Sequence, residues 1–197
     1  IEEIHKIQHL KLRARNPLYD AREVFLFECY TGIRISDILT LKWKHITDEK
    51  ISIRMRKTEK LLSIPINDYV RAVLDRRRCA VENNGGKITS EKYVFNILKV
   101  DVDEVSAQDA LNAISSATAV INKQLKKIAK KTGIDKNLST HCARHSYATA
   151  LLTNNIPLPV IKEMLGHSDI KVTQIYAKVV DSKRNEVVEC LNKVYHG

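Results

Sequence analysis

The sequence predicts a mainly α-helical fold with one small antiparallel β-sheet. Apolar residues recur at the spacing of a half-buried helix in several segments, clearest over residues 18–31 and 111–132. Two short stretches, Ile51–Met55 and Leu62–Ile66, alternate between apolar and polar residues instead, and the charged segment 57–60 joins them. That pattern is typical of a β-hairpin. A chain of 197 residues can bury one good core, so we expect a single domain.

Three helices are expected before the hairpin. Residues 1–14 carry apolar residues at helical spacing, and Pro17 is expected to open a helix over 18–31 that ends at Gly32. The core residues expected on this second helix are Val24, Phe25, Phe27 and Cys29. A short helix, Ser36–Leu41, should follow, and the single tryptophan, Trp43, is expected in the core or at an interface.

After the hairpin, Asn67 or Asp68 is expected to cap another long helix. Its buried stripe would consist of Val70, Val73, Leu74 and Val81. We expect Arg76–Arg78 to face solvent, Tyr93–Phe95 to form a short strand, and residues 99–110 to form an irregular connection. In the helix over 111–132, the residues expected to face inward are Val120, Ile121, Leu125 and Ile128.

The charge balance favours a polyanionic partner. Lysine and arginine number 33 against 23 acidic residues, a net charge of +10, and nucleic acid is the commonest polyanion that a basic domain binds. The best candidate for a DNA-backbone surface is the lysine face of the helix over 111–132, represented by Lys126, Lys127 and Lys130. A merely solubilising surface is the alternative.

The cysteines and the hydropathy of the chain indicate the kind of compartment in which the protein works. The cysteines Cys29, Cys79, Cys142 and Cys190 are widely scattered, which is typical of thiols in a reducing compartment. No apolar run approaches the length of a membrane span, and no signal peptide is visible. Because the chain starts at Ile1 without methionine, we expect it to be a fragment.

The C-terminal stretch carries the residues that point to chemistry. His141 and Arg144 stand three apart, which places them on one face of a helix. Pro157 can open a second helix that ends near Gly166, and His167 follows directly. Tyr176 lies nine residues farther on. A cation, two imidazoles and a phenol in one compact helical hairpin predict a phosphate-handling site.

This pattern resembles the C-terminal motif of the tyrosine recombinases, the integrase family that cuts and rejoins DNA, which reads His-x-x-Arg, then Leu-Gly-His, then Tyr. The matching residues are His141–Arg144, Leu165–His167 and Tyr176. Upstream, Thr31–Leu39 is similar to the family's first arginine box, and Lys57 lies where its β-hairpin lysine is expected. The resemblance covers nearly the whole chain and implies the fold of a tyrosine recombinase catalytic domain.

The resemblance also implies a mechanism without metal, ATP or another cofactor. Arg34 and Arg144 would neutralise the non-bridging oxygens of a phosphodiester with planar forks of donors that never titrate. Tyr176 would attack phosphorus and form a 3′-phosphotyrosine, which stores the bond energy for resealing. These two steps describe strand cleavage and rejoining.

The remaining residues of the implied site handle protons and orientation. Lys57 would protonate the leaving deoxyribose hydroxyl, with Lys60 as the second candidate. His141 and His167 would hydrogen-bond the phosphate or carry the tyrosine proton. Asp37 stands where the family more often has glutamate, and it could still orient Arg34.

For the whole chain, the resemblance implies a catalytic domain over residues 1–197, without the N-terminal DNA-clamping domain of full recombinases. Its partner would be double-stranded DNA, on which it would assemble as a dimer or tetramer. Such enzymes act in the bacterial cytoplasm and are often encoded by phages or other mobile elements. The segment Ser182–Tyr195 is expected to be a helix that docks on a neighbouring protomer.

Three alternatives accompany this reading. A type IB topoisomerase-like enzyme would use the same chemistry to relax DNA, and a non-catalytic module would keep the fold only to bind DNA. A zinc site formed by His141, His145 and His167 would give hydrolysis instead, but it would leave Arg34, Arg144 and Tyr176 without a role. His5 and His9 have the same i,i+4 spacing and are expected to face solvent.

Overall fold

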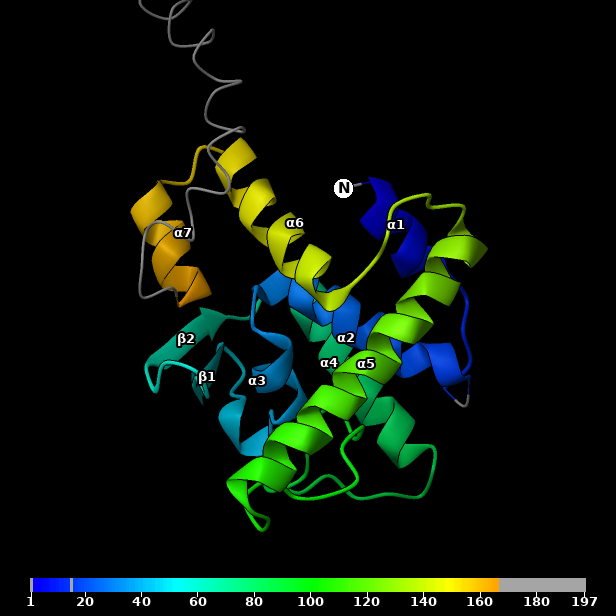
Figure 1. The fold of residues 1–197 in the computed structure, drawn as a ribbon, viewed down its shortest axis with the longest axis vertical. Helices are drawn as coiled ribbons and strands as arrows, with labels where there is room; N and C mark the ends of the chain where they lie inside the picture. The colour runs from blue at the N-terminus through cyan, green and yellow to red at the C-terminus, as the bar shows by residue number, and fades with distance from the viewer. Residues whose placement is uncertain (1, 15, 167–197) are drawn as a thin grey trace, which may run out of the picture. The chain divides into compact units, whose positions relative to one another are not determined.

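The computed structural model describes residues 2–14 and 16–166 and confirms the mainly helical fold with one two-stranded antiparallel sheet (Figure 1). The elements are α1 (Glu2–His9), α2 (Pro17–Thr31), α3 (Ile35–Leu39), η1 (Trp43–His45), β1 (Lys50–Arg54), β2 (Leu61–Pro65), α4 (Asp68–Glu82), α5 (Ala107–Thr132), α6 (Thr140–Thr153) and α7 (Leu158–Leu165). The chain divides into two compact units, residues 1–147 and 148–197. None of the helices in the described ranges is long and apolar enough to cross a membrane.

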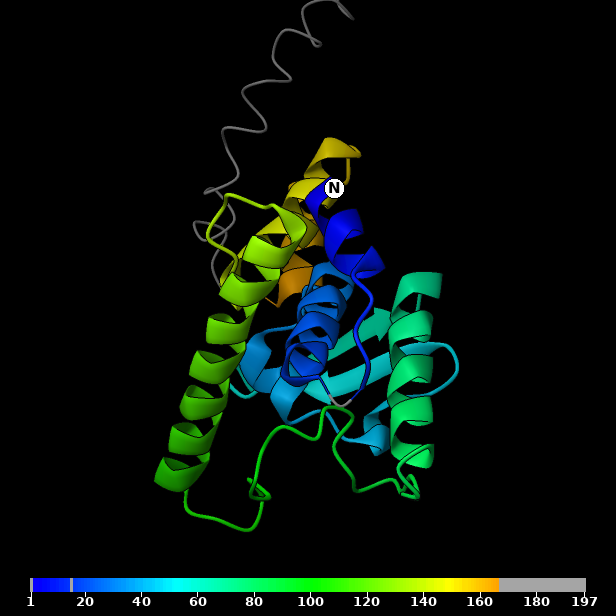
Figure 2. The same cartoon turned by 90° about the vertical axis from the view of Figure 1, so that its right-hand side faces the viewer.

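Helix α2 forms the centre of the first unit. The side chain of Asn16 accepts a hydrogen bond from the backbone N–H of Leu18 (2.9 Å) and so begins the helix next to Pro17. The helix packs against α1, α4 and α5, and Figure 2 shows it between α5 on one side and α4 on the other. The four core residues expected on it are all buried.

The hairpin forms as the alternating pattern predicts. Strands β1 and β2 pair antiparallel with Ser52 opposite Ser63. The inward side chains of both strands are buried: Ile51, Ile53, Leu62 and Ile64. The backbone N–H of Met55 donates to the carbonyl of Lys60 (2.9 Å) and closes the connection that carries Lys57.

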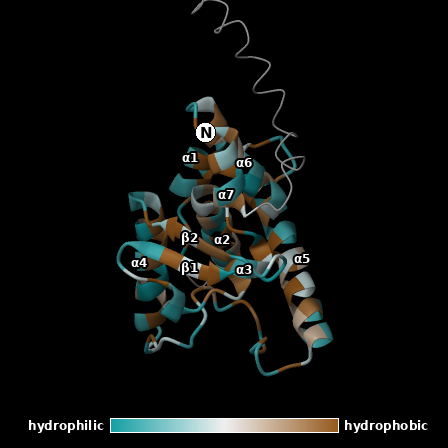
Figure 3. Cartoon of the chain, turned by 90° about the vertical axis from the view of Figure 1, so that its left-hand side faces the viewer, coloured by the Kyte–Doolittle hydropathy of each residue, from teal (hydrophilic) through white to brown (hydrophobic). Residues whose placement is uncertain are grey.

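Helix α5 differs from the prediction at its start and on one face. It begins four residues earlier than expected because Ser106 Oγ accepts a hydrogen bond from the N–H of Asp109 (3.1 Å). The residues that it buries include Ile114, Ile121, Leu125 and Ile128. Val120 was expected inward, and this is wrong, since it is 56% exposed. It lies one residue, about 100°, away from the buried stripe, and Figure 3 shows the mixed hydropathy of this helix.

Helix α4 buries Val70, Val73 and Leu74 as expected, whereas Val81 is only partly buried. The expectation that Arg77 faces solvent is wrong, because this residue is 5% exposed. Its Nη1 pairs with a carboxylate oxygen of Asp20 on α2, and its Nε donates to the carbonyl of Val94 (3.2 Å). A buried arginine is stable here because a carboxylate from another helix neutralises it.

The segments after α4 form no further strand among the described residues. Tyr93 makes only an isolated bridge with Lys42, so the strand expected over 93–95 is not formed. The connection over 99–110 is irregular up to the start of α5. Two of its acidic residues pair with a buried lysine. The Nζ of the buried Lys42 lies 3.1 Å from Asp101 and 2.7 Å from Asp103.

The first half of α6 packs against the end of α2. Gly32 ends α2 in the left-handed conformation (φ 67°), and its N–H donates to the carbonyl of Glu28 (2.8 Å). A Cβ on residue 32 would overlap Cδ1 of Tyr147 and would lie 2.7 Å from its Cε1. The Gly32 carbonyl also accepts a hydrogen bond from Nη1 of Arg144. Glycine is therefore required twice at this position, for its φ angle and for the close approach of α6.

Two buried glutamates on α2 lie in different electrostatic environments. The carboxylate of Glu23 accepts from Arg22 Nη2 (2.7 Å) and from Arg76 Nε (2.9 Å). The Oε2 atom of Glu28 accepts no hydrogen bond from any residue in the described part of the chain. Burial raises the pKa of Glu28 well above its usual value, and the nearby charge of Arg144 offsets only part of that effect.

The described part of the second unit contains the turn expected at Asn154 and Asn155, where Asn155 has φ 62°. Helix α7 follows Pro157, buries Ile161 and Leu165, and ends at Gly166 in the left-handed conformation. His167, Tyr176, Cys190 and the helix expected over 182–195 lie outside the described residues.

We predict that Gly32→Ala lowers the free energy of unfolding by about 3 kcal/mol, the sum of a left-handed alanine and an overpacked contact with Tyr147. Gly133→Ala is the matched control, because Gly133 has φ 64° but no atom within 4 Å of its Cβ position. Its cost should be about 1 kcal/mol. Denaturant titration measures both, and equal losses in the two variants would refute the close packing of Tyr147.

The raised pKa of Glu28 predicts a specific pH dependence of stability. Below the ordinary pKa of 4.5 the carboxyl is neutral in both states, so its burial has no electrostatic cost. As the pH rises above 4.5, the folded state retains the proton that the unfolded state loses. Stability should then fall by at most about 1.4 kcal/mol per pH unit until the folded-state pKa is reached.

Glu28→Gln should remove this decline and unfold at higher denaturant concentration than the parent at pH about 8. Glu23→Gln is the control on the same helix. It should destabilise the protein by about 3 kcal/mol, because it removes the partner of two arginines. A Glu28→Gln variant less stable than the parent at that pH would show instead that Glu28 is an ionised partner of Arg144.

Candidate active site

Arg34 is placed by the break between two helices. Gly32 ends α2, Ile33 is fully buried, and Arg34 is the extended N-cap residue of α3. Its side chain is partly buried, and its Nη1 lies 3.3 Å from the Sδ of Met55 at the end of β1. The guanidinium thus lies beside the base of the hairpin connection.

Arg144 reaches the same region from α6. It is 8% exposed, and its Nη1 donates to the carbonyl of Gly32 across 112 residues of sequence. Gly32 precedes Arg34 by two residues, so one short segment holds one arginine and anchors the other. Helices α2, α3 and α6 therefore bring together Arg34 and Arg144, the two arginines predicted to bind the phosphate.

Asp37 links this arrangement to the hairpin. The residue is buried, and its Oδ1 accepts a hydrogen bond from the backbone N–H of Arg56 (2.9 Å). Burial raises the pKa of Asp37, while the Arg56 hydrogen bond and then the charges of Arg34 and Arg144 lower it. Both guanidinium groups lie close enough to act on this carboxyl, but its Oδ2 accepts no hydrogen bond from any described residue. That Asp37 orients the arginines therefore stays a prediction.

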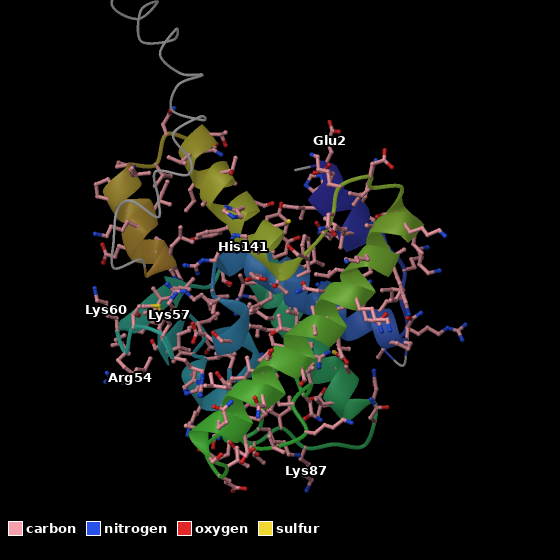
Figure 4. The ribbon with its side chains drawn as sticks, viewed as in Figure 1. Glu2, Arg54, Lys57, Lys60, Lys87 and His141 are labelled. Carbon is pink, nitrogen blue, oxygen red and sulfur yellow. The ribbon has the colours of Figure 1, made fainter. Side chains whose placement is uncertain are left out.

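The two candidate proton donors lie on the connection between β1 and β2, where Figure 4 shows Lys57 and Lys60 on the hairpin turn. Both are exposed, and neither Nζ makes a hydrogen bond or ion pair with another described residue. Met55 and Arg56, which contact Arg34 and Asp37, directly precede Lys57. The hairpin base is thus fixed to the arginines, while the lysines extend beyond it.

His141 lies exposed on the first turn of α6 (Figure 4). Its Nε2 is 2.6 Å from Nε2 of His145, and the two rings meet edge to face. These are two of the three histidines of the zinc alternative, and the third, His167, lies outside the described residues. Within the described ranges, no group of three or more potential metal ligands forms.

The lysines predicted to contact DNA and the N-terminal histidine pair are exposed. Lys126, Lys127 and Lys130 face away from the buried stripe of α5. His5 and His9 also face solvent, as expected, and a His9 ring nitrogen bonds to the carbonyl of His5 (2.8 Å).

Three features near the site were missed by sequence reasoning. These are the use of the Gly32 carbonyl as the anchor for Arg144, the buried Glu28 near that arginine, and the hydrogen bond between His145 and His141. The i,i+4 spacing of the two histidines was the available signal for the last feature. A backbone carbonyl gives no signal in the sequence.

Comparison with known proteins agrees with the family that the sequence motifs suggested. Residues 2–183 match the Phage integrase family. The tyrosine recombinase XerD of Listeria monocytogenes serotype 4b (strain F2365) is 48% identical over 160 residues, which cover 80% of this chain and 49% of the relative. A XerC-like tyrosine recombinase of Caldanaerobacter subterraneus subsp. tengcongensis matches 98% of the chain at 27% identity, and 53% of its own length is covered. The chain thus spans about half the length of these curated relatives.

Solved structures of recombinases have a similar fold. The crystal structure of XerA recombinase has a TM-score of 0.66 at 22% identity and covers 94% of this chain and 63% of its own. The XerH site-specific recombinase, in a post-cleavage complex with its palindromic difH substrate, has a TM-score of 0.65 at 21% identity, with 97% of this chain and 50% of its own covered. The match over residues 2–183, together with this fold, shows that the chain belongs to the phage integrase family, the tyrosine recombinases.

Proposed function

We propose that this protein is a site-specific DNA recombinase or integrase that cleaves and rejoins strands through a covalent 3′-phosphotyrosine. The observation that carries the proposal is the anchoring of Arg144 on the carbonyl of Gly32, two residues before Arg34. Residues 110 positions apart in the sequence thereby supply two cations to one location. The proposal gives residues 1–197 the role of the catalytic domain.

The substrate chemistry explains why two arginines are needed. A phosphodiester carries a negative charge that repels an incoming nucleophile, and the charge on its oxygens grows as the pentacoordinate transition state forms. Guanidinium groups donate two parallel hydrogen bonds and keep their charge at every accessible pH. Arg144 is buried and already oriented by a backbone carbonyl, so it needs little reorganisation during the reaction.

The proposed reaction exchanges one ester for another. The phenolate oxygen of Tyr176 forms a bond to phosphorus, and the bond from phosphorus to the 5′ oxygen of the next nucleotide breaks. Lys57 gives a proton to that leaving oxygen, while His141 or His167 accepts the phenol proton. Attack by a free 5′ hydroxyl on the phosphotyrosine reverses every step, so rejoining needs neither metal nor ATP.

The partners follow from the same proposal. Double-stranded DNA suits the net charge of +10 and the exposed lysines of α5, Lys126, Lys127 and Lys130. The relative XerH was crystallised on a palindromic site, and a palindrome has two equivalent halves, so we propose that this chain also self-associates on DNA. The cytoplasm is the proposed location, because the DNA substrate is there.

Each of the three rival functions makes a prediction that can be tested. A type IB topoisomerase would share the covalent step, but the similar proteins are named recombinases, which favours recombination. A non-catalytic module would bind DNA without forming an adduct. A zinc hydrolase would require His141, His145 and His167 to share a metal, and a direct hydrogen bond already joins the first two.

We predict that Arg144→Ala lowers the rate of strand cleavage by about 10²–10³, the usual loss for one charge-stabilising group. Arg144→Lys should recover only part of this loss, because a compact ammonium cannot reproduce the planar fork of donors that a guanidinium presents. The rate is measured as covalent adduct formed on a nicked duplex. Arg78→Ala, which removes an exposed arginine of α4, is the control and should cleave like the parent.

We predict that Tyr176→Phe binds DNA but forms no denaturation-resistant adduct, since the substitution removes one oxygen and almost no volume. The parent should form the adduct in excess EDTA. Tyr195→Phe is the control and should still trap DNA, because Tyr195 is 28 residues beyond His167 rather than nine. Adduct formation by Tyr176→Phe would exclude this nucleophile, and EDTA-sensitive cleavage by the same variant would favour the histidine-bound metal.

The same assay distinguishes the non-catalytic module. That function predicts DNA binding without any adduct from the parent protein. The test should therefore also use a chain extended by the N-terminal region of the relatives, so that weak DNA binding is not mistaken for missing chemistry.

A further inference from the structure

His141 and His145 form a contact that the proposed reaction does not yet use. The residues are one turn apart on α6, with Nε2 atoms 2.6 Å apart, ring centroids 4.2 Å apart and ring planes at 89°. Helical spacing brings such side chains near each other, but it does not aim one ring nitrogen at the other. At this distance the contact is an N–H···N hydrogen bond, so one ring donates and the other accepts.

We propose that His145 is a positioning residue that holds the ring of His141 and determines which of its nitrogens carries the proton. In this arrangement the Nε2–H of His145 donates to Nε2 of His141, and the proton of a neutral His141 is on Nδ1. The inference rests on the proposed function, and it gives His141 the hydrogen bond to the phosphate, which leaves His167 to accept the phenol proton.

The direction of the hydrogen bond follows from what His141 must do. Its Nε2 is engaged by His145, and its Nδ1 makes no hydrogen bond with another described residue. Nδ1 is therefore the nitrogen left for the substrate. Phosphate oxygens only accept hydrogen bonds, so Nδ1 must carry a proton, and Nε2 of a neutral ring must then be the acceptor.

The surroundings of His145 make it the neutral partner. It is partly buried, whereas His141 is exposed. Burial lowers the pKa of His145, and the charges of His141 and Arg144 lower it further. A neutral imidazole has a single N–H, and the hydrogen bond to His141 directs that proton to Nε2.

This arrangement has a chemical consequence. The opposite tautomer would present the Nδ1 lone pair of His141 to a phosphate oxygen, which is repulsive. At metal sites, residues that fix the tautomer of a ligating histidine are worth about 10- to 100-fold in affinity or activity, and we expect an effect of that size for His141. His145 contributes in this way through His141 and needs no contact with the substrate.

The test compares two substitutions at the same position in the chain of residues 1–197. His145→Phe keeps a flat ring against His141 but removes the N–H, and His145→Gln restores a donor without the ring. The tautomer of His141 is read from its ¹⁵N chemical shifts at pH about 8, where exposed imidazoles are neutral. We expect the proton on Nδ1 in the parent and in His145→Gln, and a shift of the proton to Nε2 in His145→Phe.

The cleavage measurement uses the same proteins. His145→Phe should form the covalent adduct about 10- to 100-fold more slowly with unchanged DNA affinity, and His145→Gln should recover most of the rate. His9→Phe is the matched control, because it makes the same change in the exposed pair His5 and His9 and should alter nothing. Thermal unfolding of each variant confirms that it is folded.

Two results would overturn the inference. One is an unchanged His141 tautomer in folded His145→Phe, and the other is a changed tautomer with an unchanged cleavage rate. If no protein in the series forms an adduct, even when extended by the N-terminal region of the relatives, the proposed function fails, while the chemical shifts still decide whether His145 sets the tautomer. The two hypotheses therefore fail in distinguishable ways.

Discussion

The contact of α6 with the end of α2 is the constraint on which the proposed site depends. At Gly32 the chain leaves the helix with a positive φ, and the ring of Tyr147 occupies the space that a side chain would need. The Gly32 carbonyl, freed from helical pairing, accepts the hydrogen bond of Arg144. One residue without a side chain thus sets the approach of α6, the orientation of one arginine and, two positions later, the place of the other.

Two buried carboxyls, those of Asp37 and Glu28, lie near the arginines at this contact. Asp37 lies near both guanidinium groups but directs one oxygen to the backbone N–H of Arg56. Glu28 lies near Arg144 in a buried position that raises its pKa. A carboxyl that favours its neutral form competes weakly with a phosphate for a guanidinium. This differs from Glu23 on the same helix, whose carboxylate is fully used by two arginines.

Sequence reasoning succeeded where local patterns decide the structure. The hairpin follows from alternation, and α2 follows from its apolar run between Asn16 and Gly32. It failed where contacts between distant segments decide. Arg77 is buried because Asp20 of α2 meets it, and Lys42 is buried among acids of a connection that shows no periodicity. The exposure of Val120 depends on which face α5 turns toward the core, and a sequence pattern does not fix this to within one residue. The pairing of Arg144 with a backbone carbonyl cannot be derived from residue types.

The most direct measurement of the central claim uses a substrate that lacks the charge which the arginines are proposed to neutralise. A methylphosphonate at the scissile position replaces one non-bridging oxygen with a methyl group and makes the linkage neutral. If Arg34 and Arg144 act as a charge clamp on that phosphate, Arg144→Ala should cleave the methylphosphonate nearly as fast as the parent does, while remaining about 10²–10³ slower on ordinary DNA. An equal loss on both substrates would contradict the account, because it would show that Arg144 supports the fold and not the phosphate.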